Sequence, residues 1–275
     1  MDALTMAHSR REFLLTTTVG AAAALAGCAT KSSCCDAGCD TGKPDTSCYE
    51  MRIYHIAPGK SEALQNRFRN HTLKLFARHN ITSIGYWLPV KEDDQRLHFL
   101  LRYPNREARE ASWKAFMADP DWQAAQKASE ANGPLVQKVE NPFMVLTDYS
   151  PKVVTGNVSK DGVFEYRSYT AAAGRLANLD ARFRDHTVKL FAKHGMHNYG
   201  YWHLMPDQAG ADVTLNYFLT HASQEAAKQS FSAFGQDPAW KEAREASEKN
   251  AGGSLTAPNG VKSLFLRPTD FSPTR

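Results

Sequence analysis

The feature that most constrains the fold of this chain is an internal repeat. The stretch "RFRNHTLKLFARH" at residues 67–79 returns as "RFRDHTVKLFAKH" at residues 182–194, with ten of the thirteen positions identical. Self-similarity of this kind is typical of one supersecondary unit that is used twice. In a chain of 275 residues, the repeat predicts two similar units of about 100 residues each.

The two units end alike, in "TDYSP" at residues 147–151 and "TDFSP" at residues 269–273. These ends place the first unit at residues 49–151 and the second at residues 163–275. The polar, glycine-containing segment between them, residues 152–162, is predicted to be a linker.

Each unit carries the same order of predicted elements. A strand leads into a long helix, two further strands follow, and a second helical stretch interrupted by Asp-Pro precedes a last strand. This β-α-β-β-α-β order predicts an α+β fold of two tandem ferredoxin-like repeats. The helices cover one face of each sheet, so the two free faces are expected to pack together as an α+β barrel. The sequence leaves open whether the barrel closes within one chain, as a monomeric pseudo-dimer, or between the chains of a homo-oligomer.

The first 27 residues are predicted to be a signal peptide. Twin arginines, Arg10 and Arg11, precede an apolar stretch at residues 13–26 that is too short to span a bilayer. The arginines resemble a Tat export signal, and "LAGC", which ends at Cys28, resembles a bacterial lipobox. A Sec signal with two incidental arginines is the alternative. We therefore expect an exported protein of the cell envelope or periplasm, anchored to a membrane by lipid on Cys28.

All five cysteines lie within the first 48 residues. Those other than Cys28 fall in a polar tether, residues 28–48, at Cys34, Cys35, Cys39 and Cys48. One or two disulfides would suit an oxidising compartment, and a small metal site is the alternative. Two adjacent cysteines do not match the usual spacing of a zinc knuckle, so disulfides are favoured and no metal site is predicted.

Composition and motifs exclude several classes of function. The formal net charge of +4 is spread along the chain, whereas a nucleic-acid partner requires a clustered basic face, so none is predicted. Residues 49–275 contain no cysteine, which excludes thiol catalysis in the two units. The motifs G-x-S-x-G, H-E-x-x-H and G-x-G-x-x-G are also absent from the sequence. Cofactor and catalytic residues therefore stay unidentified.

The first strand of each unit repeats a polar pattern, E-x-R-x-Y, while the apolar positions between vary. We assign the apolar set to the helix side and the polar set to the space between the sheets. The predicted cavity there is lined by Glu50, Arg52, Tyr54, Trp87, His98, Glu165, Arg167, Tyr169, Trp202 and Asn216, with His71 and His186 at its edge. These residues form either a pocket for a small-molecule ligand or a set of Glu–Arg pairs that neutralise one another.

The repeated histidines of the long helices have two interpretations. His71 and His186 fall among apolar residues at helical spacing, so they are expected to face the sheet. Each is then either a core histidine bonded to a strand or a general base or haem ligand at the cavity edge. His79 and His194 close the helices, where the helix dipole favours a cation.

The combined pattern resembles the NIPSNAP family. The resemblance rests on "YEMRIYHIAPGK", "RFRNHTLKLFARHNI" and "GYW" in the first unit and on their second copies, and it spans residues 49–273. The second copy departs from it at Ala173, which replaces Pro58. The resemblance implies dimeric α+β barrel domains, but no defined biochemical activity. Better-known members are implicated in vesicle traffic and mitochondrial quality control, and relatives by fold include cofactor-free monooxygenases and haem-handling proteins.

Two functions follow as hypotheses. The favoured one is a non-catalytic, lipid-anchored module that binds a small molecule in the barrel. The alternative is a cofactor-free monooxygenase or haem-handling enzyme, with His71 or His186 as base or axial ligand.

Overall fold

The computed structural model describes residues 45–159 and 162–275. The predicted signal peptide, Cys28 and the cysteines at positions 34, 35 and 39 lie outside the described residues. In the described part of the chain, every helix is too short or too polar to cross a membrane.

The first repeat has the predicted order of elements. It consists of β1 (Cys48–Ile56), α1 (Ser61–Arg67), a π-helical turn η1 (Phe68–Thr72), α2 (Leu73–Arg78), β2 (Thr82–Pro89), β3 (Arg96–Tyr103), α3 (Arg106–Ala118), α4 (Pro120–Ser129), β4 (Val136–Glu140) and β5 (Phe143–Leu146). The Asn105 side chain caps α3, and Asp119 caps α4 with a proline at its first turn. Both caps satisfy backbone N–H groups that the first turn of a helix leaves free.

The second repeat follows the same plan, with one long final strand in place of two. It consists of β6 (Val163–Ala171), α5 (Leu176–Arg182), η2 (Phe183–Thr187), α6 (Val188–Lys193), β7 (His197–Leu204), β8 (Thr214–His221), α7 (Gln224–Gln236), α8 (Pro238–Asn250) and β9 (Thr256–Pro268). Ser223 and Asp237 cap α7 and α8 as their counterparts do in the first repeat.

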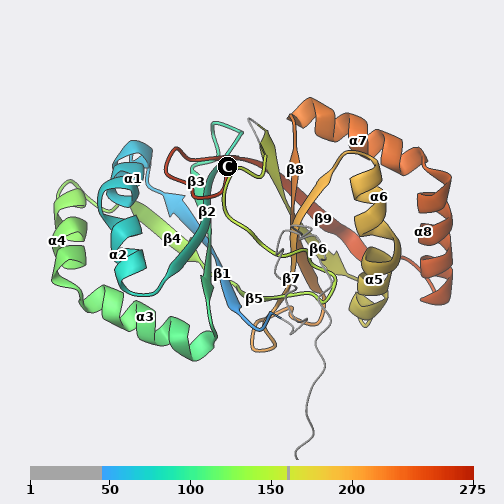
Figure 1. The fold of residues 1–275 in the computed structure, drawn as a ribbon, viewed down its shortest axis with the longest axis horizontal. Coiled ribbons are helices and arrows are strands. Elements are labelled where there is room, and N and C mark those ends of the chain that lie inside the picture. The colour runs from blue at the N-terminus through green and yellow to red at the C-terminus, as the bar shows by residue number, and fades with distance from the viewer. Residues whose placement is uncertain (1–44, 160–161) are drawn as a thin grey trace, which may run out of the picture. The chain divides into compact units, whose positions relative to one another are not determined.

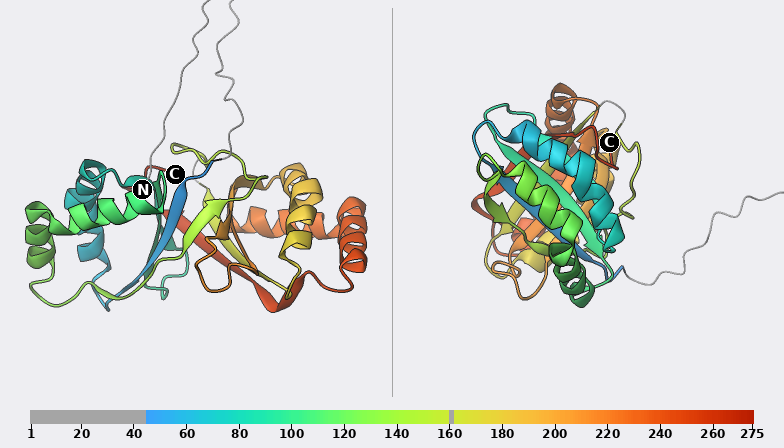
Figure 2. Two further views of the ribbon diagram at one scale, coloured as in Figure 1. Left: turned by 90° about the horizontal axis from the view of Figure 1, so that it is seen from below. Right: turned by 90° about the vertical axis from the view of Figure 1, so that its left-hand side faces the viewer.

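The strands form one closed barrel. Around the barrel the order is β3-β2-β9-β6-β8-β7-β5-β1, and β1 pairs with β3 to complete the circle, while β4 extends the pairing along β1. The last strand of each repeat pairs with the other repeat, because β9 joins β2 and β5 joins β7. Figures 1 and 2 show the helices of the two repeats on opposite outer flanks of the sheet. The barrel therefore closes within a single chain.

The repeated TD-x-SP motif fastens each repeat to the other. Thr269 donates its backbone N–H to the Tyr86 carbonyl at 2.9 Å, and Ser272 Oγ accepts the Tyr86 N–H at 2.9 Å. The neighbouring Asp270 carboxylate accepts two hydrogen bonds from Arg69, at 2.8 and 2.9 Å. The motif at residues 147–151 makes the equivalent bonds to β7 and to the first helix of the second repeat.

The barrel interior is an apolar core, and this corrects the assignment of faces made from the sequence. Tyr49, Met51 and Ile53 point into the barrel with the interior residues of the second repeat. The intervening Glu50 and Arg52 lie on the helix side, as do the other members of the E-x-R-x-Y sets, Tyr54, Glu165, Arg167 and Tyr169. The interior positions vary between repeats because they pack against one another, and the period of two leaves the choice of face open.

The remaining four residues assigned between the sheets do lie there. Trp87 and Trp202 are fully buried in the interior cluster, and Trp87 packs 5.4 Å from Phe164 and 5.1 Å from Phe218, measured between ring centres. Asn216 accepts a hydrogen bond from Tyr166 at 3.1 Å. His98 is buried opposite Trp87, and its burial lowers its pKa to about 4. These side chains contribute to a packed core.

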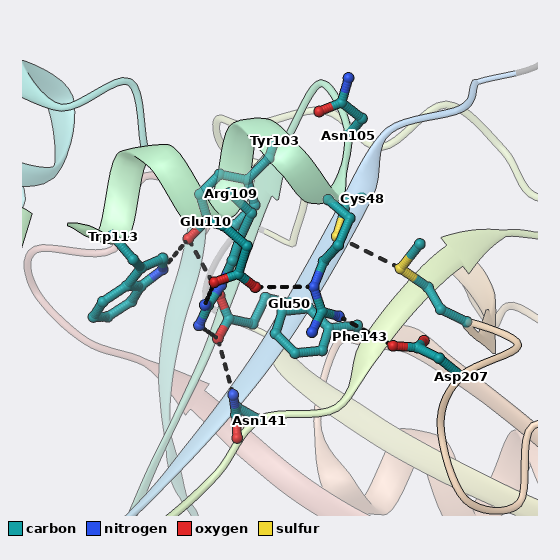
Figure 3. A network of polar contacts seen from close by, with 12 residues as sticks. Cys48, Glu50, Tyr103, Asn105, Arg109, Glu110, Trp113, Asn141, Phe143 and Asp207 are labelled. Atoms are coloured by element: carbon teal, nitrogen blue, oxygen red, sulfur yellow. Dashed lines mark hydrogen bonds and ion pairs between the residues drawn. The ribbon is translucent and has the colours of Figure 1, made fainter. Parts of the chain in front are cut away.

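Cys48, which we grouped with the tether, is the first residue of β1. It is buried, and its Sγ lies 3.7 Å from Sδ of Met205 (Figure 3). Burial raises the pKa of its thiol to about 11, so this cysteine is an inert part of the core.

Candidate functional site

Each repeat has a cavity of about 370 Å³ between its helices and the outer face of the sheet. Nine pairs of identical, equivalent residues line the two cavities, and they are Arg52 and Arg167, Tyr54 and Tyr169, Arg67 and Arg182, Phe68 and Phe183, Thr72 and Thr187, Phe76 and Phe191, Phe116 and Phe234, Trp122 and Trp240, and Glu130 and Glu248. The E-x-R-x-Y strands therefore do contribute to cavities, but on the face opposite to the one predicted.

A buried glutamate lies beneath the first cavity. Glu50 is fully buried and accepts hydrogen bonds from Arg109 at 2.8 and 3.0 Å and from Tyr103 at 3.3 Å (Figure 3). It also accepts a hydrogen bond from Arg52 at 2.5 Å. Burial alone would raise the pKa of Glu50. The hydrogen bonds from Arg109 and the charge of Arg52 outweigh this effect and lower the pKa below its ordinary value. The carboxylate is ionised and fully occupied by donors.

Arg52 bonds to Glu50 and also lines the first cavity. One terminal nitrogen donates to Tyr54 Oη at 3.3 Å, and the guanidinium carbon lies 4.1 Å from the centre of a Trp113 ring. Such a cation–π contact stabilises a desolvated guanidinium. The Nε of Arg52 is buried and has no hydrogen-bond partner among the described residues.

Arg67 lies on the opposite wall of the first cavity. Its Nη1 donates to Glu130 at 2.8 Å, and its guanidinium lies 5.3 Å from the centre of the Trp122 ring. Its buried Nε is likewise without an acceptor in the described part of the chain. The two arginines that line the cavity thus each have one buried donor, the Nε group, without an acceptor in the described residues.

A π-helical turn shapes this wall. In η1 the backbone N–H of Leu73 bonds to the carbonyl of Phe68, five residues earlier, and Thr72 Oγ1 donates to the Arg67 carbonyl at 3.2 Å. Phe68 and Thr72, the first and last residues of the turn, both line the cavity. Single π-turns inside helices occur frequently at functional sites. The second repeat has the same turn in η2.

The second cavity keeps this plan with different partners. Glu165 is buried, lies 2.9 Å from Nε2 of His221 through its Oε2, and accepts hydrogen bonds from Arg167 and Ser263. Arg167 also donates to the Tyr217 hydroxyl at 2.9 Å. As in the first repeat, burial alone would raise the pKa of Glu165, and its hydrogen bonds and the arginine charge lower it.

The NIPSNAP family model matches residues 49–151 and 164–273, which carry the two cavities. The chain belongs to the NIPSNAP family. A comparison with curated proteins finds no match.

Solved structures place the two NIPSNAP repeats among α+β barrels. An uncharacterized NIPSNAP domain protein from Burkholderia xenovorans is 24% identical over 38% of this chain and 99% of its own, with a TM-score of 0.34. Putative monooxygenases from Lactobacillus acidophilus and Fusobacterium nucleatum cover 83% and 84% of this chain and 96% and 95% of their own. Their TM-scores are 0.51 and 0.52, and their identities 14% and 7%. At such identities the similarity concerns the fold alone.

The prediction that His71 and His186 face the sheet is wrong. Both side chains are exposed, and the next residue of each NIPSNAP repeat, Thr72 or Thr187, takes the buried position. The π-turn causes this, because it shifts the helical face by one residue relative to regular spacing. His79 and His194 do end their helices, each with Nε2 at 2.7 Å from the aspartate that caps the last helix of its repeat, Asp119 for α4 and Asp237 for α8.

Sequence reasoning missed the second arginine of each NIPSNAP cavity. Arg67 and Arg182 are the first residues of the repeated thirteen-residue stretch, and the cavity residues Phe68 and Thr72 are also unchanged in its second copy. Identity between the repeats was therefore the available signal. These unchanged positions mark a wall that both cavities share.

Proposed function

We propose that this protein is a non-catalytic module that binds small molecules in the two helix–sheet cavities of its NIPSNAP repeats. The observation that carries the proposal is the set of unused donors on buried arginines, the Nε groups of Arg52 and Arg67 in one cavity and of Arg182 in the other. A buried donor without an acceptor costs about 1–3 kcal/mol, which a ligand acceptor would remove.

The size and lining of the cavities support this proposal. Ligand sites commonly occupy about 300–1,000 Å³ and combine apolar walls with a few placed polar groups. Both cavities have volumes of about 370 Å³, aromatic walls and two arginines. Both cavities also have a π-turn in their wall, where the helix departs from regular α-helical geometry.

The state of the acidic groups favours binding over catalysis. A general base needs a free lone pair near its substrate and a pKa near the working pH. Glu50 and Glu165 are saturated by donors, and their pKa values are lowered. The histidines that we considered as a base or haem ligand, His71 and His186, are exposed on the helices.

The proposal includes export and a lipid anchor on Cys28, supported by the twin arginines and the lipobox of the sequence. Mass spectrometry of the N-terminal peptide from the membrane fraction tests this part. A diacylglyceryl adduct on Cys28 is expected, and an unmodified, uncleaved N-terminus would contradict it.

Binding is tested by native mass spectrometry and absorption spectroscopy of the exported protein, together with a panel of small ligands. Tryptophan at the exposed cavity residues, Val139→Trp and Val261→Trp, is expected to block binding in one cavity each. Val154 is equally exposed, so Val154→Trp is the matched control. If blocking both cavities leaves every ligand bound as before, the proposal fails. A haem band or oxygen consumption would instead support the enzyme alternative.

A further inference from the structure

We propose that the second cavity is specific for a monoanion, the carboxylate of a small apolar acid bound between Arg182 and Arg244, whereas the first cavity takes uncharged ligands. This inference rests on the proposed binding function and assigns different ligands to the two repeats. It follows from a difference in how the cavity arginines are compensated.

In the first repeat, the charge of Arg67 is matched by one carboxylate. Arg67 Nη1 lies 2.8 Å from Glu130 Oε1, within hydrogen-bond distance. Four residues after Trp122, the cavity is lined by the neutral Gln126. The glutamate therefore serves a single arginine, and a further cation of the lining, Lys138, is paired with Glu140 at 2.9 Å.

In the second repeat, two arginines share the equivalent carboxylate. Arg244 occupies the position of the glutamine, four residues after Trp240. Glu248 lies 3.6 Å from Arg182 Nη1 and 3.6 Å from Arg244 Nε, so neither contact is a close hydrogen bond. With Arg167 matched by Glu165, the second cavity carries one positive charge in excess of its carboxylates.

Arg182 lines the second cavity and is the cation that an anion bound there would compensate. Its side chain is 6% exposed, and both Nε and Nη1 are buried without a hydrogen-bond partner in residues 45–159 and 162–275. Burial lowers the pKa of Arg182, because the distant Glu248 does not offset the loss of hydration. A buried cation in this state is stabilised strongly by an anion at hydrogen-bond distance.

The walls define the rest of the ligand. Phe183, Phe191 and Phe231 line the cavity, and Trp240 packs 4.4 Å from Phe234. These walls suit an apolar body, and a guanidinium fork matches the two oxygens of a carboxylate. One excess charge fits a monoanion better than a phosphate, which carries up to two.

Isothermal titration calorimetry of the full-length protein with phenylacetate and its neutral analogue phenylacetamide tests the inference. Phenylacetate is expected to bind at one site per chain and at least about ten-fold more tightly than the amide at that site, since one charge-assisted hydrogen bond contributes about that much. Arg244→Gln gives the second cavity the residue of the first, and it is expected to remove this preference.

The control is Lys241→Gln, which removes a positive charge from an exposed position of the same helix outside the cavity. If the amide binds as tightly as the carboxylate, or if Lys241→Gln weakens phenylacetate as much as Arg244→Gln, the inference is overturned. No binding of phenylacetate at millimolar concentration also overturns it. The proposed binding function fails separately, only if the tryptophan blocks described above affect no ligand.

Discussion

The tryptophan of each GYW stretch folds back over its own glycine, and this leaves no room for a side chain at the glycine. A Cβ atom added at Gly200 would lie 2.4 Å from Cη2 of Trp202, and 2.9 and 3.0 Å from two further ring atoms. Ordinary van der Waals contact begins at 3.4 Å. Gly200→Ala therefore forces the indole to withdraw or the strand to shift. Gly85 and Trp87 have the same relation, with a closest approach of 2.2 Å.

The surroundings of Trp202 set the cost of this substitution. The indole is fully buried, with the Tyr49 ring at 5.7 Å and the Phe218 ring at 6.2 Å between centres. A rigid ring packed on several sides cannot move away cheaply, and overpacking of this kind typically costs about 1–3 kcal/mol. We expect Gly200→Ala to lower the free energy of unfolding by about 2–3 kcal/mol, the upper part of that range.

Urea unfolding, followed by circular dichroism and tryptophan fluorescence, measures this change. Gly235→Ala is the control, because Gly235 lies exposed in α7 with no atom within 4 Å of the added Cβ. Alanine favours a helix over glycine by up to about 1 kcal/mol, so this variant should be as stable as the original chain or slightly more stable. The reasoning would be refuted by a Gly200→Ala protein whose stability equals that of Gly235→Ala.

Three further predictions concern buried polar groups of the barrel and of the TD-x-SP motif at residues 269–273. Buried His98 stays neutral in the folded state, with a pKa of about 4, whereas in the unfolded chain this histidine takes up a proton near pH 6.5. The free energy of unfolding should therefore fall by about 2 kcal/mol between pH 7 and pH 5. His98→Asn, which introduces the residue of the second repeat, should make urea unfolding less dependent on pH in this range. Ser272→Ala removes the acceptor of a buried backbone N–H and should cost about 1–3 kcal/mol by urea unfolding, whereas Asp270→Asn breaks only an exposed ion pair and should leave the midpoint nearly unchanged. Glu165→Gln should lower the free energy of unfolding at pH 7 by about 3–5 kcal/mol, because it leaves the Arg167 charge uncompensated. The pKa of Glu165 is lowered in the folded state, so the difference from the original protein should shrink as the pH falls below the pKa of a glutamate in the unfolded chain, about 4.3. A Glu165→Gln protein that unfolds at the same urea concentration as the original would contradict the role of that pair.

The order of elements could be predicted from the sequence because its signals are local. Asp119 before Pro120 marks a helix start through cap chemistry that needs no distant partner, and the structure has a helix boundary there. The closure of the barrel, in contrast, depends on contacts between residues that are distant in the sequence. The pairing of β9 with β2 joins Pro268 to Trp87, far apart in the chain, and no local pattern specifies it.

The site was harder to predict because two of its determinants leave no mark in residue spacing. The alternation in β1 shows that Glu50 and Tyr49 face opposite ways, but it does not say which of them meets the helices. The π-turn at Phe68–Thr72 moves His71 outward, and regular helical spacing cannot reveal an inserted residue. Only the identity of Arg67 and Arg182 in the two copies pointed to the wall of the cavities.

Closure of the barrel within one chain also has a genetic consequence. In a symmetric dimer of identical subunits, every mutation appears twice, so the two sites must change together. Here a single codon change alters one half alone, as the presence of Gln126 in one repeat and Arg244 in the other illustrates. Assembly of the two halves is also intramolecular, so it does not depend on the concentration of the protein in the cell. A scarce protein can thus acquire two different sites without risking the assembly that supports both.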